Sequence, residues 1–495
     1  MQDPPVVIQG GMGVAVSSWP LAKAVSQTGQ LGVVSGTALD VVLARRLQLG
    51  DPGGHLRRAM AEFPFPEMAQ RILNRYFVPE GKSPSEPFVS CRMPRTELSQ
   101  EHLELLVVAN FTEVYLAKED HAGAVGINYL EKIQVSILPS LFGALLAGVD
   151  YVLMGAGIPR MIPGVIDRLC EGQLVELKLD VEGTSPADPF VVRFDPTAFC
   201  GGCLPWSNRP RFLAIVASAT LATMLARKAN GRIDGFVLEG PSAGGHNAPP
   251  RGPSEFNQRG EPVYGARDEI DLDAIRALDL PFWMAGSYGD PASLVDALRR
   301  GAAGVQVGTA FAYCEESGLR ADIKRQVLEM SRRGTIEVFT DPAASPTGFP
   351  FKVLQLPDTL SDASVYDGRK RMCDVGYLRR GYRKADGSLG WRCPAEHPDT
   401  YLKKGGDSAQ LSGRKRLCNA LLANVDLGQI RSDGSQEPPL VTSGDDVRQI
   451  ARFLPYPEAT SYSARDVVEH LLSGLGQTLP VAGIRQAVSI VGHVD

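Results

Sequence analysis

The chain has 495 residues, of which 44% are hydrophobic and 22% are charged, and its formal net charge at pH 7 is −5. This composition is typical of a water-soluble globular protein, and the negative charge disfavours nucleic acid as a partner. The eight cysteines are widely spread and no signal peptide is evident, which favours a reduced, cytoplasmic protein. Pro139 and Asp150 interrupt the apolar run from Val135 to Ile158, so we expect no membrane partner.

The chain begins with a strand, a helix and a second strand, at Val6 to Gln9, Trp19 to Thr28 and Leu31 to Ser35. Helical patterns continue to alternate with apolar runs, and the helices are expected at Ser136 to Leu146, Ile158 to Cys170, Leu213 to Lys228 and Pro291 to Arg300. Six further strands are expected at Ala124 to Asn128, Tyr151 to Met154, Leu174 to Leu177, Gly235 to Glu239, Phe282 to Ala285 and Gly304 to Gly308. Eight strands in this alternation predict an α/β fold, the (β/α)8 TIM barrel, with its ligand at the carboxyl ends of the strands.

Two regions fall outside the alternation. Residues 40–120 are longer than an ordinary connection between the second and third strands, so we interpret them as an insertion. Within it we expect short helices at Arg57 to Met60 and Met68 to Phe77, and a strand at Phe88 to Cys91. The alternation stops near residue 335, which predicts a barrel over 1–334 and an α+β or irregular accessory domain over 335–495. The expected helices of that domain are Asp445 to Phe453 and Ser463 to Ser473.

Small residues follow several of the predicted strands. Gly244, Gly245 and His246 come after the strand that ends at Glu239, and comparable loops are Gly10-Gly11-Met12 and Gly126-Ile127-Asn128. Glycine lets a flat ligand approach the backbone, and histidine exchanges protons near neutral pH. The carboxyl ends of the strands are therefore the candidate site.

These loops, in this order, resemble those of the nitronate monooxygenase (2-nitropropane dioxygenase) family and of the related flavin-dependent enoyl-acyl-carrier-protein reductase II. Ala243 to His246, Ile8 to Met12 and Met154 to Pro159 carry the likeness, which extends over roughly residues 4–318. The resemblance implies a TIM barrel that binds FMN. The implied cofactor contacts are Gly10, Gly11, Met12, Asn128, Glu239, Gly244, Gly245, Gly286, Ser287, Gln306, Val307, Gly308 and Thr309.

The loops after the seventh and eighth strands are the expected phosphate site, because barrel enzymes often bind phosphate there. Ala285 to Gly289 and Gln306 to Phe311 offer backbone N–H groups with little side-chain obstruction. Two positions depart from the family pattern. Glu239 stands where glutamine is common, and Ser287 replaces a second glycine, which implies a carboxylate at the flavin's pyrimidine edge and a tighter phosphate loop.

His246 is the predicted catalytic residue, since an unperturbed pKa of about 6.5 suits a general base or acid at neutral pH. By resemblance it would take the proton α to a nitro group, or assist the cofactor in a reductase. The following loop, Asn247 to Gly252, is longer than in the short family members, which leaves the substrate open. Arg251 could hold an anionic substrate, or contact only water.

Cys200 and Cys203 form a CxxC, which is compatible with a redox pair, half of a zinc site or two unrelated thiols. Further ligands would have to come from Cys373, Cys393 and Cys418, at spacings wider than usual, so no metal site is predicted.

Two near-identical hexads, Gly368 to Cys373 and Gly413 to Cys418, lie in a segment with 13 Lys or Arg and 6 Asp or Glu, between Tyr366 and Arg416. Such a segment forms either a solvated basic face or a surface that attracts phosphate-bearing partners.

We therefore expect an FMN-dependent enzyme that oxidises small nitronates or nitroalkanes to carbonyl compounds with dioxygen. One alternative is a reductase that uses NAD(P)H as electron donor and acts on an enoyl thioester or quinone. Another is a non-catalytic FMN-binding scaffold with a basic interaction domain. A homodimer is compatible with each of them.

Overall fold

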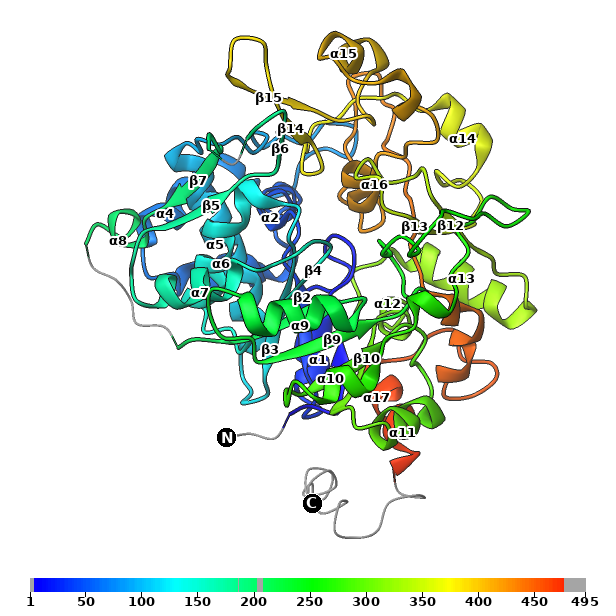
Figure 1. Cartoon of the computed structure of the whole chain (residues 1–495). Coiled ribbons are helices and arrows are strands. Elements are labelled where there is room, and N and C mark those ends of the chain that lie inside the picture. The colour runs from blue at the N-terminus through cyan, green and yellow to red at the C-terminus, as the bar shows by residue number, and fades with distance from the viewer. Residues whose placement is uncertain (1–3, 186, 203–207, 476–495) are drawn as a thin grey trace.

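The computed structural model describes residues 4–185, 187–202 and 208–475, and a parallel sheet of eight strands lies at its centre (Figure 1). Along the sheet the strands run β1 (Val7–Gln9), β11 (Gly304–Val307), β10 (Phe282–Ala285), β9 (Gly235–Glu239), β8 (Arg211–Val216), β4 (Tyr151–Gly155), β3 (Val125–Leu130) and β2 (Gly32–Ser35). The sheet closes on itself because Leu31 N–H donates to Val7 at 3.1 Å and Gln9 N–H donates to Leu31 at 2.9 Å. The predicted (β/α)8 barrel is confirmed.

One strand of the barrel differs from the prediction. The segment expected as the fifth barrel strand is β5 (Val175–Lys178), which pairs antiparallel with β7 (Val191–Phe194) outside the barrel. Its place is taken by β8, which includes the first residues of the helix predicted at Leu213 to Lys228. That helix, α9 (Ala219–Lys228), begins only after Ser218, whose hydroxyl accepts the Leu221 N–H. A parallel strand buried on both faces has a continuous apolar sequence, so periodicity does not distinguish it from a buried helix.

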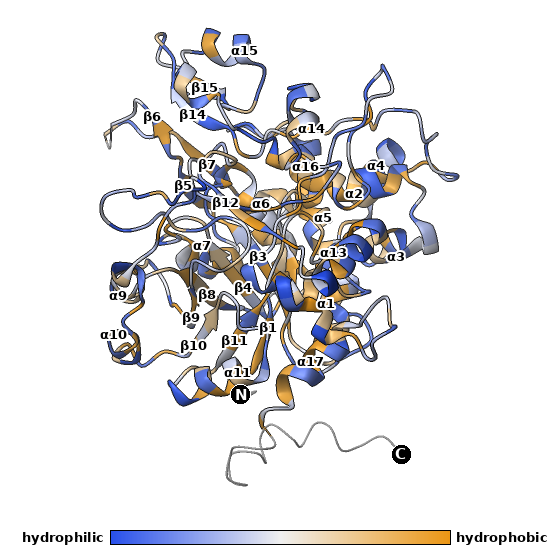
Figure 2. Ribbon diagram, turned by 90° about the vertical axis from the view of Figure 1, so that its right-hand side faces the viewer, coloured by the Kyte–Doolittle hydropathy of each residue, from blue (hydrophilic) through white to orange (hydrophobic). Residues whose placement is uncertain are grey.

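Helices surround the barrel, and apolar side chains fill its interior. Ile8, Leu153, Leu213 and Trp283 are buried together inside it. Figure 2 shows the central strands as largely hydrophobic and the surrounding helices as hydrophilic on their outer faces. The remaining helices of this part are α1 (Trp19–Ser26), α6 (Gln134–Leu146), α7 (Ile162–Cys170), α8 (Pro196–Phe199), η2 (Ala266–Asp268), α10 (Leu272–Arg276), α11 (Pro291–Arg299), α12 (Thr309–Ala312) and α13 (Ala321–Arg333).

The predicted insertion after β2 is helical. It contains α2 (Leu39–Gln48), η1 (Pro52–Gly54), α3 (His55–Ala61), α4 (Pro66–Tyr76) and α5 (Gln100–Lys118). The 19-residue α5 is buried against α1, α2 and α6, so it serves as the crossover into β3. The strand predicted at Phe88 to Cys91 is wrong. The N–H groups of Phe88 and Val89 donate to side-chain oxygens of Gln429 and Gln48 instead of to a neighbouring strand.

Most of the carboxyl-terminal region covers the end of the barrel at which the strands terminate, whereas α17 (Ala464–Leu472) packs against α1 and α11 at the side of the barrel (Figure 1). Its elements are β12 (Val338–Asp341), β13 (Phe351–Leu354), α14 (Ala363–Gly368), β14 (Arg380–Arg383), β15 (Leu389–Arg392), α15 (Pro398–Lys403), η3 (Ser408–Gln410), α16 (Leu417–Ala423), η4 (Asp445–Phe453) and α17 (Ala464–Leu472). In both views α14 to α16, β14 and β15 gather above the barrel, and β14 pairs with β6 (Val181–Glu182) of the barrel chain (Figures 1 and 2).

The two helices predicted in this region are present, though the first, η4, is a 3₁₀-helix. A capping box starts α17, in which the Ser463 hydroxyl accepts the Asp466 N–H and the Asp466 carboxylate accepts the Ser463 N–H. Residues of the barrel and of the carboxyl-terminal region belong to one continuous hydrophobic core. The division into two domains at residue 335 stays a prediction.

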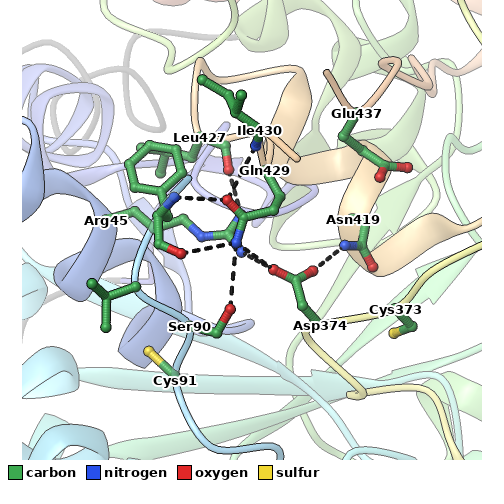
Figure 3. Close-up of polar contacts among 12 residues, drawn as sticks. Arg45, Ser90, Cys91, Cys373, Asp374, Asn419, Leu427, Gln429, Ile430 and Glu437 are labelled. Carbon is green, nitrogen blue, oxygen red and sulfur yellow. Dashed lines mark hydrogen bonds and ion pairs between the residues drawn. The ribbon is translucent and has the colours of Figure 1, made fainter. Parts of the chain in front are cut away.

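A buried polar network joins the carboxyl-terminal region to the insertion (Figure 3). Arg45 of α2 donates to the Asp374 carboxylate at 2.7 Å and to the Leu427 carbonyl at 2.6 Å. Gln429 also donates to Asp374, at 3.0 Å, and accepts the Phe88 N–H at 2.8 Å. Because buried polar groups are costly unless they are paired, this network fixes how the region sits on the barrel.

Candidate functional site

A cavity of about 430 Å³ lies at the carboxyl ends of the barrel strands. Its walls come from the loops after β1, β3, β4, β9, β10 and β11, together with the carboxyl-terminal region. All the predicted site residues line it, which are Gly10, Gly11, Met12, Asn128, Glu239, Gly244, Gly245, His246, Gly286, Ser287, Gln306, Val307, Gly308 and Thr309. The structure thus brings the whole predicted set together, while their individual roles stay predictions.

Two glycines in this wall are required by close packing. A Cβ on Gly11 would lie 2.4 Å from the Cβ of Asn128, and one on Gly244 would lie 2.8 Å from the backbone nitrogen of Gly444. Larger residues at either position would force the loops apart. Backbone atoms therefore form much of the cavity surface, as a flat ligand requires.

Unpaired polar atoms line the same cavity. Each is buried and has no hydrogen-bond partner among the described residues: Asn128 Oδ1, Asn247 Oδ1, Ser287 Oγ, Gln306 Oε1, Asn424 Oδ1 and Asp446 Oδ1. Leaving such a group unpaired costs roughly 1–3 kcal/mol. These six atoms belong to side chains that line one cavity, which makes this cavity the place where a polar ligand could supply the missing partners.

Glu239 ends β9 inside the cavity, and burial raises the pKa of its carboxyl to about 7. The group therefore titrates near neutral pH and in its protonated form is a hydrogen-bond donor. A heterocycle with an acceptor at its edge could use that donor.

His246 is more strongly perturbed than the sequence indicated. Its Nε2 lies 2.7 Å from Ser345 Oγ, and the edge of its ring packs against Phe351. Burial, and secondarily the charge of Lys132, lower the pKa of the imidazole to about 3. The pKa therefore differs from the unperturbed value near 6.5, because the carboxyl-terminal region packs against the ring and limits its hydration. At neutral pH the imidazole is uncharged, and it is a weaker base than a free histidine.

The carboxyl-terminal region forms the roof of the cavity, and these residues were missed by sequence reasoning. Phe351 bridges to His246 in antiparallel fashion, and Lys352 N–H donates to the Gly245 carbonyl at 2.9 Å. Gly245 N–H in turn donates to Thr442 Oγ1 at 2.8 Å. No local motif encodes these contacts, because they join segments about a hundred residues or more apart.

The predicted phosphate loop also contacts the roof. Thr309 Oγ1 accepts the Gly444 N–H at 3.0 Å, and a Cβ on Gly289 would lie 3.0 Å from the Asp446 carboxylate. Burial raises the pKa of Asp446 above its usual range. An ionised Asp446 would repel a phosphate in this cradle, whereas a protonated one could donate a hydrogen bond to it.

Arg251 does not line this cavity. Its guanidinium donates to the carbonyls of Arg267 and Ala217, and its side chain borders a separate surface hollow beside α9 and α10. The suggestion that it holds an anionic substrate in this site is not supported by the geometry.

The cysteines do not form a recognisable metal centre in the described part of the chain. No cluster of three or more His, Cys, Asp or Glu that could hold a metal occurs there, and Cys203 lies outside the described residues. Burial raises the thiol pKa of Cys373 and Cys418, and that of Cys393 to about 12. These three thiols are therefore protonated at neutral pH and are weak nucleophiles.

The two basic hexads do lie side by side, since the Arg369 guanidinium donates to the Arg414 carbonyl at 3.1 Å. Part of their charge is used internally. Arg416 forms a buried ion pair with Glu437 at 2.8 Å, and Lys370 pairs with Asp433. Whether the remaining charge attracts a phosphate-bearing partner stays a prediction.

Within the described ranges, none of the helices combines the length and apolar character that crossing a membrane requires.

The closed barrel, its glycine-rich cavity and the buried histidine define a class of (β/α)8 proteins whose ligand site lies at the strand ends. The model of the family described as nitronate monooxygenase matches residues 208–343, a stretch that includes β8 to β11, Glu239 and His246. Over this stretch the chain is similar to the nitronate monooxygenase family, which confirms the resemblance inferred from the loops.

Single relatives match over limited stretches. A probable nitronate monooxygenase of Bacillus subtilis is 35% identical over 103 residues, which are 21% of this chain and 28% of that protein. The nitronate monooxygenase of Pseudomonas aeruginosa is 31% identical over 154 residues, which are 30% of this chain and 42% of that protein. The chain thus spans less than half the length of the curated relatives it matches.

Among solved structures, FabK from Thermotoga maritima aligns with a TM-score of 0.49 and 16% identity, covering 98% of this chain and 96% of that one. A nitroalkane oxidase from Streptomyces ansochromogenes aligns with a TM-score of 0.43 and 18% identity, covering 98% of each chain.

Proposed function

We propose that the protein is an FMN-dependent oxidoreductase that converts alkyl nitronates or nitroalkanes into carbonyl compounds with dioxygen as the oxidant. The observation that carries the proposal is the set of unpaired polar groups around a glycine-walled cavity that also holds His246. The family match over residues 208–343, and the names of the relatives, supply the reaction class.

The residues present fit FMN. Gly286, with φ of +99°, and Gly308 expose backbone at the two loops where a phosphate would bind. Asn128 and Gln306 have buried oxygens that await a donor, and protonated Glu239 could donate to the pyrimidine edge. When bound, FMN supplies the redox chemistry by accepting electrons from the substrate.

His246 is the candidate acceptor for the proton α to a nitro group, because it lies in the same cavity, and its lowered pKa makes it a weaker base there than a free histidine. The Ser345 hydroxyl holds the ring at 2.7 Å and can either donate or accept a hydrogen bond. It can therefore stay bonded as the ring gains a proton. The roof formed by Phe351 and its neighbours keeps water from this base.

A reductase acting on an enoyl thioester or a quinone is the second candidate. The observation that favours it is a second cavity of about 570 Å³ that shares Ile133, Phe349, Tyr377 and Leu378 with the first. Together the two cavities exceed what a small nitronate needs.

Anaerobic mixing of the purified protein with propyl-1-nitronate, and separately with NADPH, tests both candidates. Loss of the flavin absorbance with the nitronate, and its return with formation of propanal on admission of air, is the expected result. Bleaching by NADPH alone would favour the reductase over the proposed function. Bleaching by neither compound would favour the non-catalytic FMN-binding scaffold. The Gly308→Glu variant, which should lack flavin, serves as the control.

A further inference from the structure

A lysine that forms no ion pair within the described chain, Lys132, lines the second cavity. Lys132 lies two residues after β3, and its Nζ is buried without a hydrogen-bond partner in the part of the chain that the structure describes. It sits 3.6 Å from the centroid of the Phe349 ring. A cation–π contact compensates only part of the cost of removing a charge from water. The site is therefore electrostatically incomplete.

Apolar side chains form the larger part of the walls of this cavity, and Gln134, Asp180 and Arg379 are among the polar ones. Ile133, Val135, Leu179, Val181, Phe349, Tyr377, Leu378 and Trp391 all line it. The other cations at its border already have contacts, since Arg379 donates to the Gly376 and Pro94 carbonyls and Arg380 to the Thr347 carbonyl. Of the acidic residues there, Glu182 pairs with Arg392, and Asp180 accepts from Gln134. Among the described cations that line the cavity, Lys132 is the one with neither a hydrogen bond nor an ion pair.

The second cavity, called the side cavity below, adjoins the first cavity at Phe349, which lines both. Lys132 stacks on this ring and lines the side cavity but not the first cavity. Its charge nevertheless contributes to lowering the pKa of His246, which lines the first cavity. A ligand that passes Phe349 would therefore have one end beside His246 and the other beside Lys132.

We propose that the side cavity binds the tail of the substrate, an alkyl chain that ends in an anionic group, and that Lys132 pairs with that group. Apolar walls suit the chain, and the unpaired ammonium suits a terminal carboxylate or phosphate. The proposal rests on the proposed function in taking the first cavity as the place of reaction, and it adds the substrate class.

The ionisation of Lys132 gives the proposal a pH signature. Burial lowers the pKa of this lysine to about 8, opposed by Glu131 and reinforced by the charge of Arg380. The other titratable groups that face it are His246, which is neutral above pH 5, and Asp180, which interacts with Glu131. The ammonium is lost as the pH rises through about 8, so anion binding should weaken above that pH and stay constant below it.

Calorimetric titration of the purified full-length protein with octanoate, octyl phosphate and 1-octanol tests the proposal without using turnover. We expect the preferred anion to bind at least roughly tenfold more tightly than 1-octanol at pH 7, the range of a hydrogen bond to a charged group. Whichever anion binds more tightly identifies the terminal group. In Lys132→Met that advantage should fall to about onefold, whereas Lys132→Arg should retain it. The exposed turn residue Lys384 offers the matched control, Lys384→Met, which should bind like the parent.

Equal binding of octanoate and 1-octanol by the parent, or unchanged anion binding by Lys132→Met, would overturn the proposal. If Lys132→Met does not fold, the parent's pH profile decides, because affinity that does not fall between pH 7 and 9.5 is incompatible with a lysine anchor. Lys132-dependent anion binding in a protein that does not oxidise nitronates would refute the proposed function and support the anchor. Nitronate oxidation without Lys132-dependent anion binding would support the proposed function and refute the anchor.

Discussion

Replacing Arg45 by methionine should detach the carboxyl-terminal region from the insertion. The Arg45 side chain is 2% exposed, and its two charged hydrogen bonds go to Asp374 and to the Leu427 carbonyl (Figure 3). Removing one partner of a fully buried ion pair costs about 3–5 kcal/mol. Asp374 is 20% exposed and would keep its hydrogen bond from Gln429, so a cost of about 3 kcal/mol is expected. Burial already lowers the pKa of Arg45, which is the mark of a desolvated charge.

The magnitude can be expressed as a shift in Tm. An unfolding entropy of about 2.1 cal/mol/K per residue corresponds to about 1 kcal/mol/K for a chain of this size. The expected decrease is therefore about 3 °C in Arg45→Met, measured by differential scanning calorimetry. Arg58→Met is the matched control, since Arg58 pairs with Glu119 at 2.8 Å but is 44% exposed, and such pairs contribute at most about 1 kcal/mol. Its Tm should fall by no more than about 1 °C.

The charge itself is tested by the double variant Arg45→Met/Asp374→Asn. The asparagine removes the negative charge and keeps an oxygen that can accept from Gln429, so the double variant should recover part of the lost stability. Equal Tm shifts in Arg45→Met and Arg58→Met would refute the reasoning, as would a double variant less stable than Arg45→Met.

Three further outcomes follow from the site. Gly308→Glu places a negative side chain in the phosphate cradle and should abolish copurification of FMN, measured by absorbance, while circular dichroism stays unchanged. His246→Ala should slow turnover of a neutral nitroalkane by roughly 10²–10⁴, while a preformed nitronate, which lacks the α proton, is largely spared; equal losses would mean that His246 only positions the ligand. Asp446 has a raised pKa, so its carboxyl ionises as the pH rises through that value, and FMN affinity should decline less with pH in Asp446→Asn, where of the two carboxyls only Glu239 still titrates, than in the parent, measured by fluorescence titration.

The sequence by itself located the cavity. Gly10, Asn128, Glu239, Gly286 and Gly308 lie at or just after barrel strands, and parallel strands joined by crossovers place all such positions at one end of the sheet. That argument needs only the order of the strands and the glycines that follow them in the sequence. It therefore holds even though most residues of β8 are predicted as part of a helix. Local patterns also sufficed for α17, whose cap is formed by Ser463 and Asp466 within one helical turn.

The tertiary structure decided the chemistry of the site. The roof depends on pairs such as Gly245 with Thr442, which lie 197 positions apart, and no local pattern reports such a contact. Burial under that roof is what lowers the pKa of His246 and raises the pKa of Glu239. A pKa depends on the solvent and charge around a group, and this environment exists only after distant segments have packed together. For the same reason the unpaired Lys132 had no sequence signal: its lack of a partner is a property of the folded interior.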